Sequence, residues 1–298
     1  MRFSLWPGPH NDWPELLALA RAAEAQGWDG LWLADHFMPN GPGPGPVAES
    51  WTALAALAVS VPRLRLGPLV SGNTYRHPAL VAKMAAAVDR MSGGRLVLGL
   101  GAAWQENEHR AYGFALPPIR ERLARLDEAC AVLRSLLTAE RTTFRGRYYR
   151  LEDAPLEPKP IQRPPPILIG GGGERVTLRI AARHADAWNC WGTPDVLRHK
   201  NAVLDRHAVE EGRDPATVRR TAVALVRLVD DPDAAARAQP GAGAATVTGT
   251  PEQLVEVMHA YRAANVDEFI VPDFNLGSRS QRAERLECFA SQVAAAVR

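Results

Sequence analysis

Residues 65–100 read RLGPLVSGNTYRHPALVAKMAAAVDRMSGGRLVLGL and contain a strand, a helix and a second strand in succession. The apolar runs Arg65–Val70 and Arg95–Leu100 are typical of strands that are buried on both faces. Between them, Pro78–Met91 begins with a proline, which suits the first turn of a helix. Two parallel strands joined through a helix are the unit from which α/β folds are built.

The same unit recurs along the chain. The predicted strands are Arg2–Leu5, Gly30–Ala34, Arg65–Val70, Arg95–Leu100, Pro166–Ile169, Asp186–Cys190, Thr221–Val229 and Glu268–Val271. The predicted helices are Asp12–Gln26, Trp51–Ser60, Pro78–Met91, Arg120–Leu137, Arg175–His184, Pro194–Glu211, Pro251–Ala264 and Gln281–Val297. In the third helix, Leu80, Ala87 and Met91 share one face. Eight such units favour an α/β fold of the (β/α)8 TIM-barrel type, one domain over residues 1–298, rather than an open doubly wound sheet.

Two segments interrupt the alternation. Residues 138–166 are polar and rich in proline, and TTFRGRYYRLE alternates around Gly146, which predicts a hairpin. We therefore expect an inserted excursion from the barrel around residues 138–166. A low-complexity loop, ARAQPGAGAA at residues 236–245, precedes the seventh helix.

Composition narrows the class of protein. The net charge of +2 comes from 35 basic and 33 acidic residues spread along the chain, so we expect neither a nucleic-acid nor a membrane partner. The start, MRFSLWPGPH, does not resemble a signal peptide, and the apolar stretch Trp51–Val61 is too short to span a bilayer. Cys130, Cys190 and Cys288 form no metal or redox motif, which fits a cytoplasmic location.

In a barrel of this type the chemistry lies where strands end. The second strand ends in LADHF, which places Asp35 and His36 at the barrel mouth. His36 either donates a proton or hydrogen bond near neutral pH or holds the following loop, and position alone favours neither role. We expect Asp35 to orient or cap. Glu49, where a long loop rich in Gly and Pro rejoins a helix, is interpreted as a charge at a helix N-terminus.

The third strand ends in a polar segment. Gly72 permits unusual backbone angles, and Asn73 and Thr74 offer hydrogen bonds, so we favour a ligand contact here over a purely structural role. Arg76 and His77 precede a helix and are interpreted as caps.

The fourth strand ends in GLGAAWQENEHRAYG. A dinucleotide motif would need a third glycine where Trp104 stands, so that interpretation is rejected. Small residues at Gly101, Ala102 and Ala103 let a flat ring lie close to the backbone, and Trp104 either stacks on a ring or walls a pocket. The polar residues that follow are Asn107, Glu108 and His109. We predict no metal site.

The fifth strand ends in four glycines, Gly170–Gly173, ahead of a helix. Successive backbone amides at a helix N-terminus form a site for a phosphate group, although a tight turn is the alternative. We favour the phosphate site, because a turn would need only one or two glycines. No P-loop lysine follows, and no nucleophile motif is present.

Four segments in order resemble the luciferase-like monooxygenase superfamily: LADHF, VSGNTYRHPALVAK, DRMSGGRLVLGLGAAWQENEHRAYG and PILIGGGGERVTLRIAARHADAWN. The similarity is closest to the actinobacterial branch of coenzyme F420-dependent oxidoreductases, and it extends to about Trp191 and more weakly beyond. It implies a bacterial luciferase-like (β/α)8 barrel, commonly a homodimer, with a tricyclic ring at its mouth. It also implies a non-proline cis peptide between Leu69 and Val70 that backs the ring.

The resemblance assigns roles to single residues. His36 lies near the reactive atom of the ring in such proteins, Asn107 contacts the cofactor, and the glycine run forms the phosphate-binding turn. We therefore predict His36 as the catalytic residue. The predicted cofactor-binding residues are Asp35, Leu69, Val70, Ser71, Asn73, Ala102, Trp104, Asn107, Gly170, Gly171, Gly172 and Trp188.

One departure concerns the substrate. Sugar-phosphate dehydrogenases of the superfamily carry a glutamate where this chain has Trp104, so we do not expect oxidation of glucose 6-phosphate; Glu108 is the nearest substitute, further along the loop. The predicted function is hydride transfer between coenzyme F420 and a small organic substrate. A reduced-FMN, oxygen-using two-component monooxygenase is the alternative, and a non-catalytic ligand-binding barrel is the third hypothesis. Candidate pocket residues indicate an apolar or aromatic substrate: Trp6, Phe37, Trp104 and Trp191.

Overall fold

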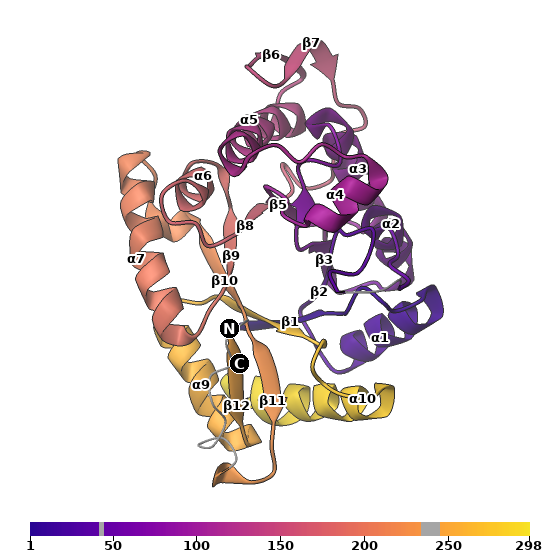
Figure 1. Cartoon of the computed structure of the whole chain (residues 1–298), viewed down its shortest axis with the longest axis vertical. Helices are drawn as coiled ribbons and strands as arrows, with labels where there is room; N and C mark the ends of the chain where they lie inside the picture. Colours follow the sequence, from indigo (N-terminus) through magenta and orange to yellow (C-terminus); the bar gives the residue numbers. More distant parts are fainter. Residues whose placement is uncertain (42–44, 234–244) are drawn as a thin grey trace.

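The computed structural model describes residues 1–41, 45–233 and 245–298 and contains a parallel barrel (Figure 1). Its strands are β1 (Arg2–Trp6), β2 (Gly30–Leu33), β3 (Arg65–Pro68), β4 (Ser71–Gly72), β5 (Leu98–Gly101), β8 (Ile167–Gly170), β9 (Ala187–Trp191), β10 (Arg219–Val223) and β13 (Glu268–Pro272). They follow one another in the order β3-β2-β1-β13-β10-β9-β8-β5-β4. Because β3 and β4 are successive pieces of one stretch and Leu66 bridges to Leu96 just before β5, the sheet closes. The predicted barrel is confirmed.

Helices surround the barrel (Figure 1). They are α1 (Trp13–Ala25), α2 (Ser50–Ser60), α3 (Pro78–Met91), α4 (Glu106–Tyr112), α5 (Ile119–Thr138), α6 (Thr177–His184), α7 (Pro194–Glu210), α9 (Pro251–Ala263), α10 (Arg279–Cys288) and α11 (Ala295–Val297). Side-chain caps explain where several begin. Asp12 accepts a hydrogen bond from the Glu15 amide at the start of α1, and Thr250 and Ser278 form capping boxes at α9 and α10.

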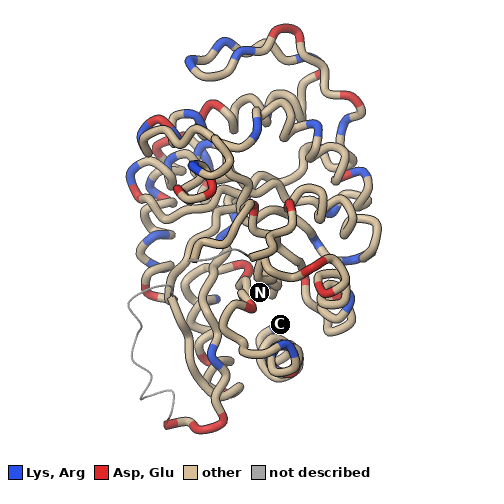
Figure 2. The backbone as a smooth tube through the Cα atoms, turned by 45° about the vertical axis from the view of Figure 1, so that its right-hand side comes forward, with Lys and Arg blue, Asp and Glu red and all other residues tan. Residues whose placement is uncertain are grey.

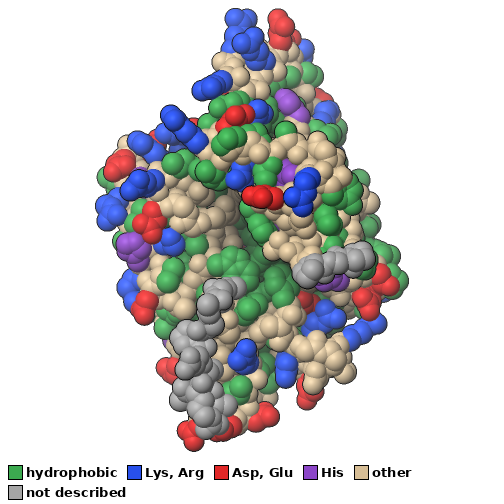
Figure 3. Space-filling view, in the orientation of Figure 1, with side chains coloured by type: hydrophobic (Ala, Val, Ile, Leu, Met, Phe, Trp, Pro, Cys, Tyr) green, Lys and Arg blue, Asp and Glu red, His purple; other side chains and the backbone are tan. Residues whose placement is uncertain are grey.

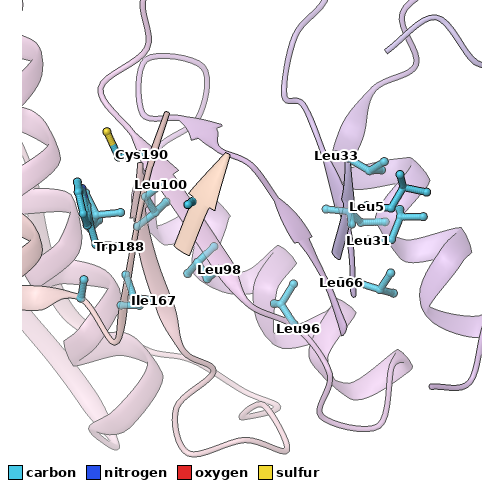
Figure 4. Packing of buried hydrophobic residues seen from close by; sticks show 14 of the residues in the cluster. Leu5, Leu31, Leu33, Leu66, Leu96, Leu98, Leu100, Ile167, Trp188 and Cys190 are labelled. Atoms are coloured by element: carbon cyan, nitrogen blue, oxygen red, sulfur yellow. The ribbon is translucent and has the colours of Figure 1, made fainter. Parts of the chain in front are cut away.

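Alternating side chains of the strands form two apolar layers. The outer layer packs between strands and helices and includes Leu31 and Leu33 of β2 and Leu98 of β5 (Figure 4). The inner layer fills the barrel with side chains that include Trp32, Val97, Leu168, Val223 and Ile270. Because both faces are buried, the strands read as continuous apolar runs in the sequence.

Several predicted elements end or divide differently. The predicted strand Thr221–Val229 is wrong as one element: β10 stays in the barrel, whereas β11 (Leu225–Leu228) leaves it to pair with β12 (Thr246–Gly249). A uniform apolar run does not reveal where a strand changes partner. The last helix contains a π-helical segment, Phe289–Ala294, and α6 begins at Thr177 rather than Arg175. Helix α4 was not predicted, and most of the loop ARAQPGAGAA lies outside the described residues.

The predicted hairpin is confirmed, with β6 (Arg141–Arg145) antiparallel to β7 (Arg150–Pro155). It lies beside α5, outside the barrel (Figure 1), and the Glu128 carboxylate of α5 accepts hydrogen bonds from the amides of Arg147 and Tyr148. The excursion thus has its own anchor on the barrel's outer helices.

One helix face described from the sequence points toward solvent and not into the core. In α3, Leu80, Ala87 and Met91 share a face, as expected, but that face is exposed. The buried face carries mostly small side chains, among them Val81 and Ala85. Because this helix is apolar on several sides, its sequence pattern does not identify which side packs.

Basic and acidic residues are interspersed along the chain (Figure 2). Across the described ranges, no helix is both long and apolar enough to cross a membrane.

Candidate cofactor site at the barrel mouth

A cavity of about 1550 Å³ opens at the carboxyl ends of the barrel strands, and Figure 3 shows the hollow with hydrophobic side chains on its floor. Of the predicted site residues, those that line it are Asp35, His36, Leu69, Val70, Ala102, Trp104, Gly170 and Gly171. Those that do not line it are Ser71, Asn73, Asn107, Gly172 and Trp188. The barrel therefore brings the ends of β2, β4, β5 and β8 to one place, as the strand-end rule predicts.

The floor of the cavity is flat because the residues around Val70 are small. The peptide between Leu69 and Val70 is cis, as predicted. A Cβ atom added at Gly101 would lie 2.5 Å from Cγ2 of Val70, and one added at Gly170 would lie 2.8 Å from its Cγ1. Glycine is thus required at both positions for Val70 to sit where it does.

His36 stands at the edge of this floor with a defined tautomer. Its Nδ1 lies 2.7 Å from Oε1 of Glu108, and Nε2 has no protein partner within the described part of the chain. A carboxylate can only accept, so Nδ1 carries the hydrogen, and in the neutral imidazole the lone pair is on Nε2 of a ring that lines the cavity. The ring of Trp104 meets the imidazole edge-on, with centroids 5.6 Å apart.

Glu108 is fully buried and accepts three hydrogen bonds, from His36, from the Phe37 amide at 2.7 Å and from the Tyr75 hydroxyl. Burial by itself raises the pKa of this carboxyl, but the bonds from His36, Phe37 and Tyr75 outweigh it and hold the pKa below 4.5. Burial and the nearby Glu108 carboxylate raise the pKa of Tyr75, so the phenol remains a donor. Glu108 therefore orients His36 and does not line the cavity as a substitute acid.

Acidification is expected to weaken this arrangement in a defined range. Because the folded pKa of Glu108 lies below its ordinary value of 4.5, its stabilisation is complete above about pH 4.5 and is lost as the pH falls through the folded pKa. Glu108→Gln does not ionise. The difference in unfolding free energy between the wild type and Glu108→Gln, measured by denaturant titration, should shrink below about pH 4.5. A difference that stays constant to about pH 3 would contradict the proposed contacts.

Asp35 is a buried hub beside His36. It accepts hydrogen bonds from both terminal nitrogens of Arg76, at 2.7 and 3.1 Å, and from the hydroxyls of Ser50 and Ser71, each at 2.8 Å. The Ser71 side chain is thus committed to Asp35 below the cavity floor. These contacts are those expected of a residue that orients its neighbours.

The helix-terminal interpretations are confirmed for two residues and changed for a third. Glu49 accepts from the Thr52 amide at 2.6 Å as the N-cap of α2, and His77 accepts from the Ala79 amide at 3.2 Å as the N-cap of α3. Arg76, which was interpreted as a cap, instead joins Asp35 and Glu49 in an ion-pair network. That network connects the ends of β2 and β4 with the starts of α2 and α3.

Two side chains donate hydrogen bonds to carbonyl groups of the glycine turn after β8. The indole of Trp188 donates to the Gly171 carbonyl at 2.8 Å, and Nζ of Lys200 donates to the Gly172 carbonyl at 2.7 Å. In the described part of the chain, the amides of Gly172 and Gly173 have no protein partner. Trp188 and Lys200 therefore shape a turn whose free amides suit an anion.

Two other residues predicted to contact the cofactor have partners within the chain. Asn73 donates to the Tyr149 hydroxyl at 3.1 Å, and Asn107 donates to the Pro39 carbonyl at 2.9 Å. Trp6, Trp104 and Trp191 line the cavity, as expected for pocket residues. Phe37 does not line it and packs edge-on against Tyr75. In the described residues, no group of His, Cys, Asp or Glu side chains could hold a metal ion.

A further wall of the cavity was not predicted. Asp273 and Asn275 follow β13, and Arg282 lies in the first turns of α10. Oδ1 of Asp273 accepts from the Gly8 amide at 2.6 Å, and Oδ2 accepts from Arg282 at 3.0 Å. The strand-end rule, applied to the eighth strand as it was to the second, would have found Asp273.

A parallel barrel with a cavity at the carboxyl ends of its strands is the architecture in which barrel enzymes carry their active sites. The model of the luciferase-like monooxygenase family matches residues 1–242, and the chain belongs to this family.

Two characterised relatives are similar in sequence. The F420-dependent glucose-6-phosphate dehydrogenase of Kineococcus radiotolerans is 35% identical over 224 residues, which cover 73% of this chain and 65% of that protein. The F420-dependent hydroxymycolic acid dehydrogenase of Mycobacterium tuberculosis is 34% identical over 224 residues, which cover 75% of this chain and 61% of that protein. The chain thus matches less than two thirds of the length of these relatives.

A solved structure confirms the fold. The F420-dependent secondary alcohol dehydrogenase in complex with an F420-acetone adduct superposes with a TM-score of 0.85 and 20% identity, covering 100% of this chain and 99% of that chain.

Proposed function

We propose that this protein is an oxidoreductase that transfers a hydride between coenzyme F420 and a small, unidentified organic substrate. The observation that carries the proposal is His36, held by buried Glu108 with its Nε2 free at the edge of a flat floor. The F420-dependent relatives support the choice of cofactor.

The residues at the mouth fit such a cofactor. Val70, with Gly101 and Gly170 beside it, forms a floor on which a planar tricyclic ring can lie. The unpartnered amides of Gly172 and Gly173, which follow the lining residues Gly170 and Gly171, would hold a phosphate just beyond the edge of the cavity. A single ligand pocket usually measures about 300–1,000 Å³, so a cavity of about 1550 Å³ has room for a substrate as well. This favours an enzyme over a non-catalytic binding barrel.

The cofactor and the protein would contribute different parts of the reaction. A bound deazaflavin would supply the two-electron hydride acceptor or donor. The proton that balances oxidation of an alcohol, or reduction of a carbonyl, is then left to the chain, and Nε2 of His36 is placed to accept or return it. Glu108 stabilises the protonated imidazole that results from acceptance.

We propose that glucose 6-phosphate is not the substrate, although several relatives carry that activity in their names. The residue at the rim of the cavity is Trp104, which is about half exposed and carries no acid. Glu108 cannot replace an acid there without abandoning three hydrogen bonds.

The cofactor is tested by direct comparison. The protein is titrated with coenzyme F420 and with FMN, and turnover is measured with each reduced cofactor, with and without oxygen. We expect tight deazaflavin binding and oxygen-independent turnover. FMN binding with oxygen consumption and no deazaflavin affinity would instead establish the monooxygenase alternative.

We further propose a homodimer in the cytoplasm. The exposed apolar row of Leu80, Ala87 and Met91 on α3 supports a partner copy on that face. Three cysteines without disulfides support a reducing compartment.

A further inference from the structure

The charged side chains that line the mouth cavity are already paired. Besides histidines and Tyr75, the ionisable lining residues in the described chain are Glu15, Asp35, Asp273 and Arg282. Asp35 pairs with Arg76 at 2.7 Å, and Glu15 pairs with Arg279 at 2.9 Å. The four charged lining residues are therefore each paired with an opposite charge, and none of them is free to bind a charged ligand.

The Asp273–Arg282 pair matters most, because it lies on the side away from the glycine turn. In the closed barrel order, β1 and β8 stand four strands apart, on opposite sides. Asp273 faces the chain that follows β1 through its bond to the Gly8 amide. The cavity thus has two ends, one at the glycine turn and one at the Asp273–Arg282 pair.

At this second end, Arg282 is the only lysine or arginine among the described lining residues. One of its terminal nitrogens donates both to Asp273, at 3.0 Å, and to the Asn11 side-chain oxygen, at 3.3 Å. Asp273 is only 3% exposed, so water screens the pair little. Asp273 cancels the one positive charge that would otherwise attract an anion.

Three aromatic rings line this end of the cavity beside the amide side chains of Asn11 and Asn275. The ring of Trp6 lies 5.0 Å from that of Phe274 and 5.8 Å from that of Trp191. An ionic group bound there gives up part of its hydration and finds no free counter-charge on the described wall, which is unfavourable. An uncharged group loses little.

We propose that the substrate is an uncharged molecule bound between the ends of β1 and β13, and that Asp273 sets this selectivity by occupying Arg282. The inference rests on the proposed function in that the substrate shares the cavity with a cofactor at the opposite end. It names the substrate class and a specificity-determining residue.

Three probes of nearly one shape test the proposal: benzamide is neutral, benzoate is an anion and benzamidine is a cation. Their affinities for the full chain are measured without cofactor by ligand-observed NMR titration. The wild type should bind benzamide about tenfold more tightly than either ion, a difference of about 1.4 kcal/mol. A wild type that prefers either ion would overturn the proposal.

Two variants should change the relative affinities for the charged probes in opposite directions. Asp273→Asn frees the charge of Arg282, so benzoate should gain about tenfold relative to benzamide. Arg282→Gln frees the charge of Asp273, so benzamidine should gain instead. The double variant Asp273→Asn, Arg282→Gln buries no unpaired charge and should restore the preference for benzamide, even if a single variant fails to fold. Unchanged relative affinities in a folded single variant would contradict the role of Asp273.

The experiment distinguishes failure of the uncharged-substrate proposal from failure of the proposed function. A wild type that prefers benzamide but does not bind coenzyme F420 overturns only the proposed cofactor. One that binds coenzyme F420 but prefers benzoate overturns only the uncharged substrate.

Discussion

Replacement of His36 by alanine is expected to lower kcat by about 10²–10⁴-fold, the range of a lost general acid or base. The imidazole lines the cavity with Nε2 unpartnered among the described residues, and Glu108 holds it through the other nitrogen at 2.7 Å. The floor around Val70 and the glycine turn stay intact. The dissociation constant for coenzyme F420, followed by its fluorescence, should therefore change by no more than about threefold, which is less than about 0.7 kcal/mol.

The matched control is His77→Ala. His77 caps α3 and does not line the cavity, so kcat should stay unchanged while stability falls by about 1 kcal/mol. Glu108→Gln should lower kcat less than His36→Ala and move the pH–rate profile, because a neutral amide stabilises a protonated His36 poorly. A His36→Ala enzyme with an unchanged chemical step and lost cofactor binding would refute the assigned role.

Asp35→Ala is expected to lower the free energy of unfolding by about 3–5 kcal/mol, the cost of removing one partner of a buried ion pair. Arg76 then keeps an ion pair with Glu49, whose side chain is 36% exposed. Asp35 is 3% exposed and the Arg76 side chain 10% exposed. Their bonds at 2.7 and 3.1 Å, with those from Ser50 and Ser71, join the strand ends on one side of the mouth. Denaturant unfolding measures the loss directly.

Asp195→Ala is the control for this prediction. Asp195 and Arg198 also form an ion pair, but their side chains are 89% and 58% exposed. Exposed pairs contribute about 0–1 kcal/mol, so the control should lose no more than that. If Asp35→Ala loses as little free energy of unfolding as Asp195→Ala, the contacts of Asp35 do not stabilise the barrel mouth.

The barrel and its chemical end could be predicted from local patterns. The strand–helix–strand unit at residues 65–100 depends only on the spacing of apolar residues, and its repetition specifies a closed parallel sheet. His36 and the glycine run were found because they directly follow predicted strands. Where a run such as Thr221–Val229 changes partner, the pattern carries no signal, and the prediction was wrong.

Contacts between distant segments were decided by the tertiary structure alone. In RLGPLVSGNTYRHPALVAKMAAAVDRMSGGRLVLGL, the sequence by itself determined two strand segments, a helix and a polar strand end. That Tyr75 from this stretch meets Glu108, and that Glu108 orients His36, depends on side chains 33 and 72 positions apart in the chain. The same holds for Asp273 and Gly8, 265 positions apart. Local periodicity specifies most of the barrel strands and helices, but only closure of the barrel brings these charges and donors within hydrogen-bond distance.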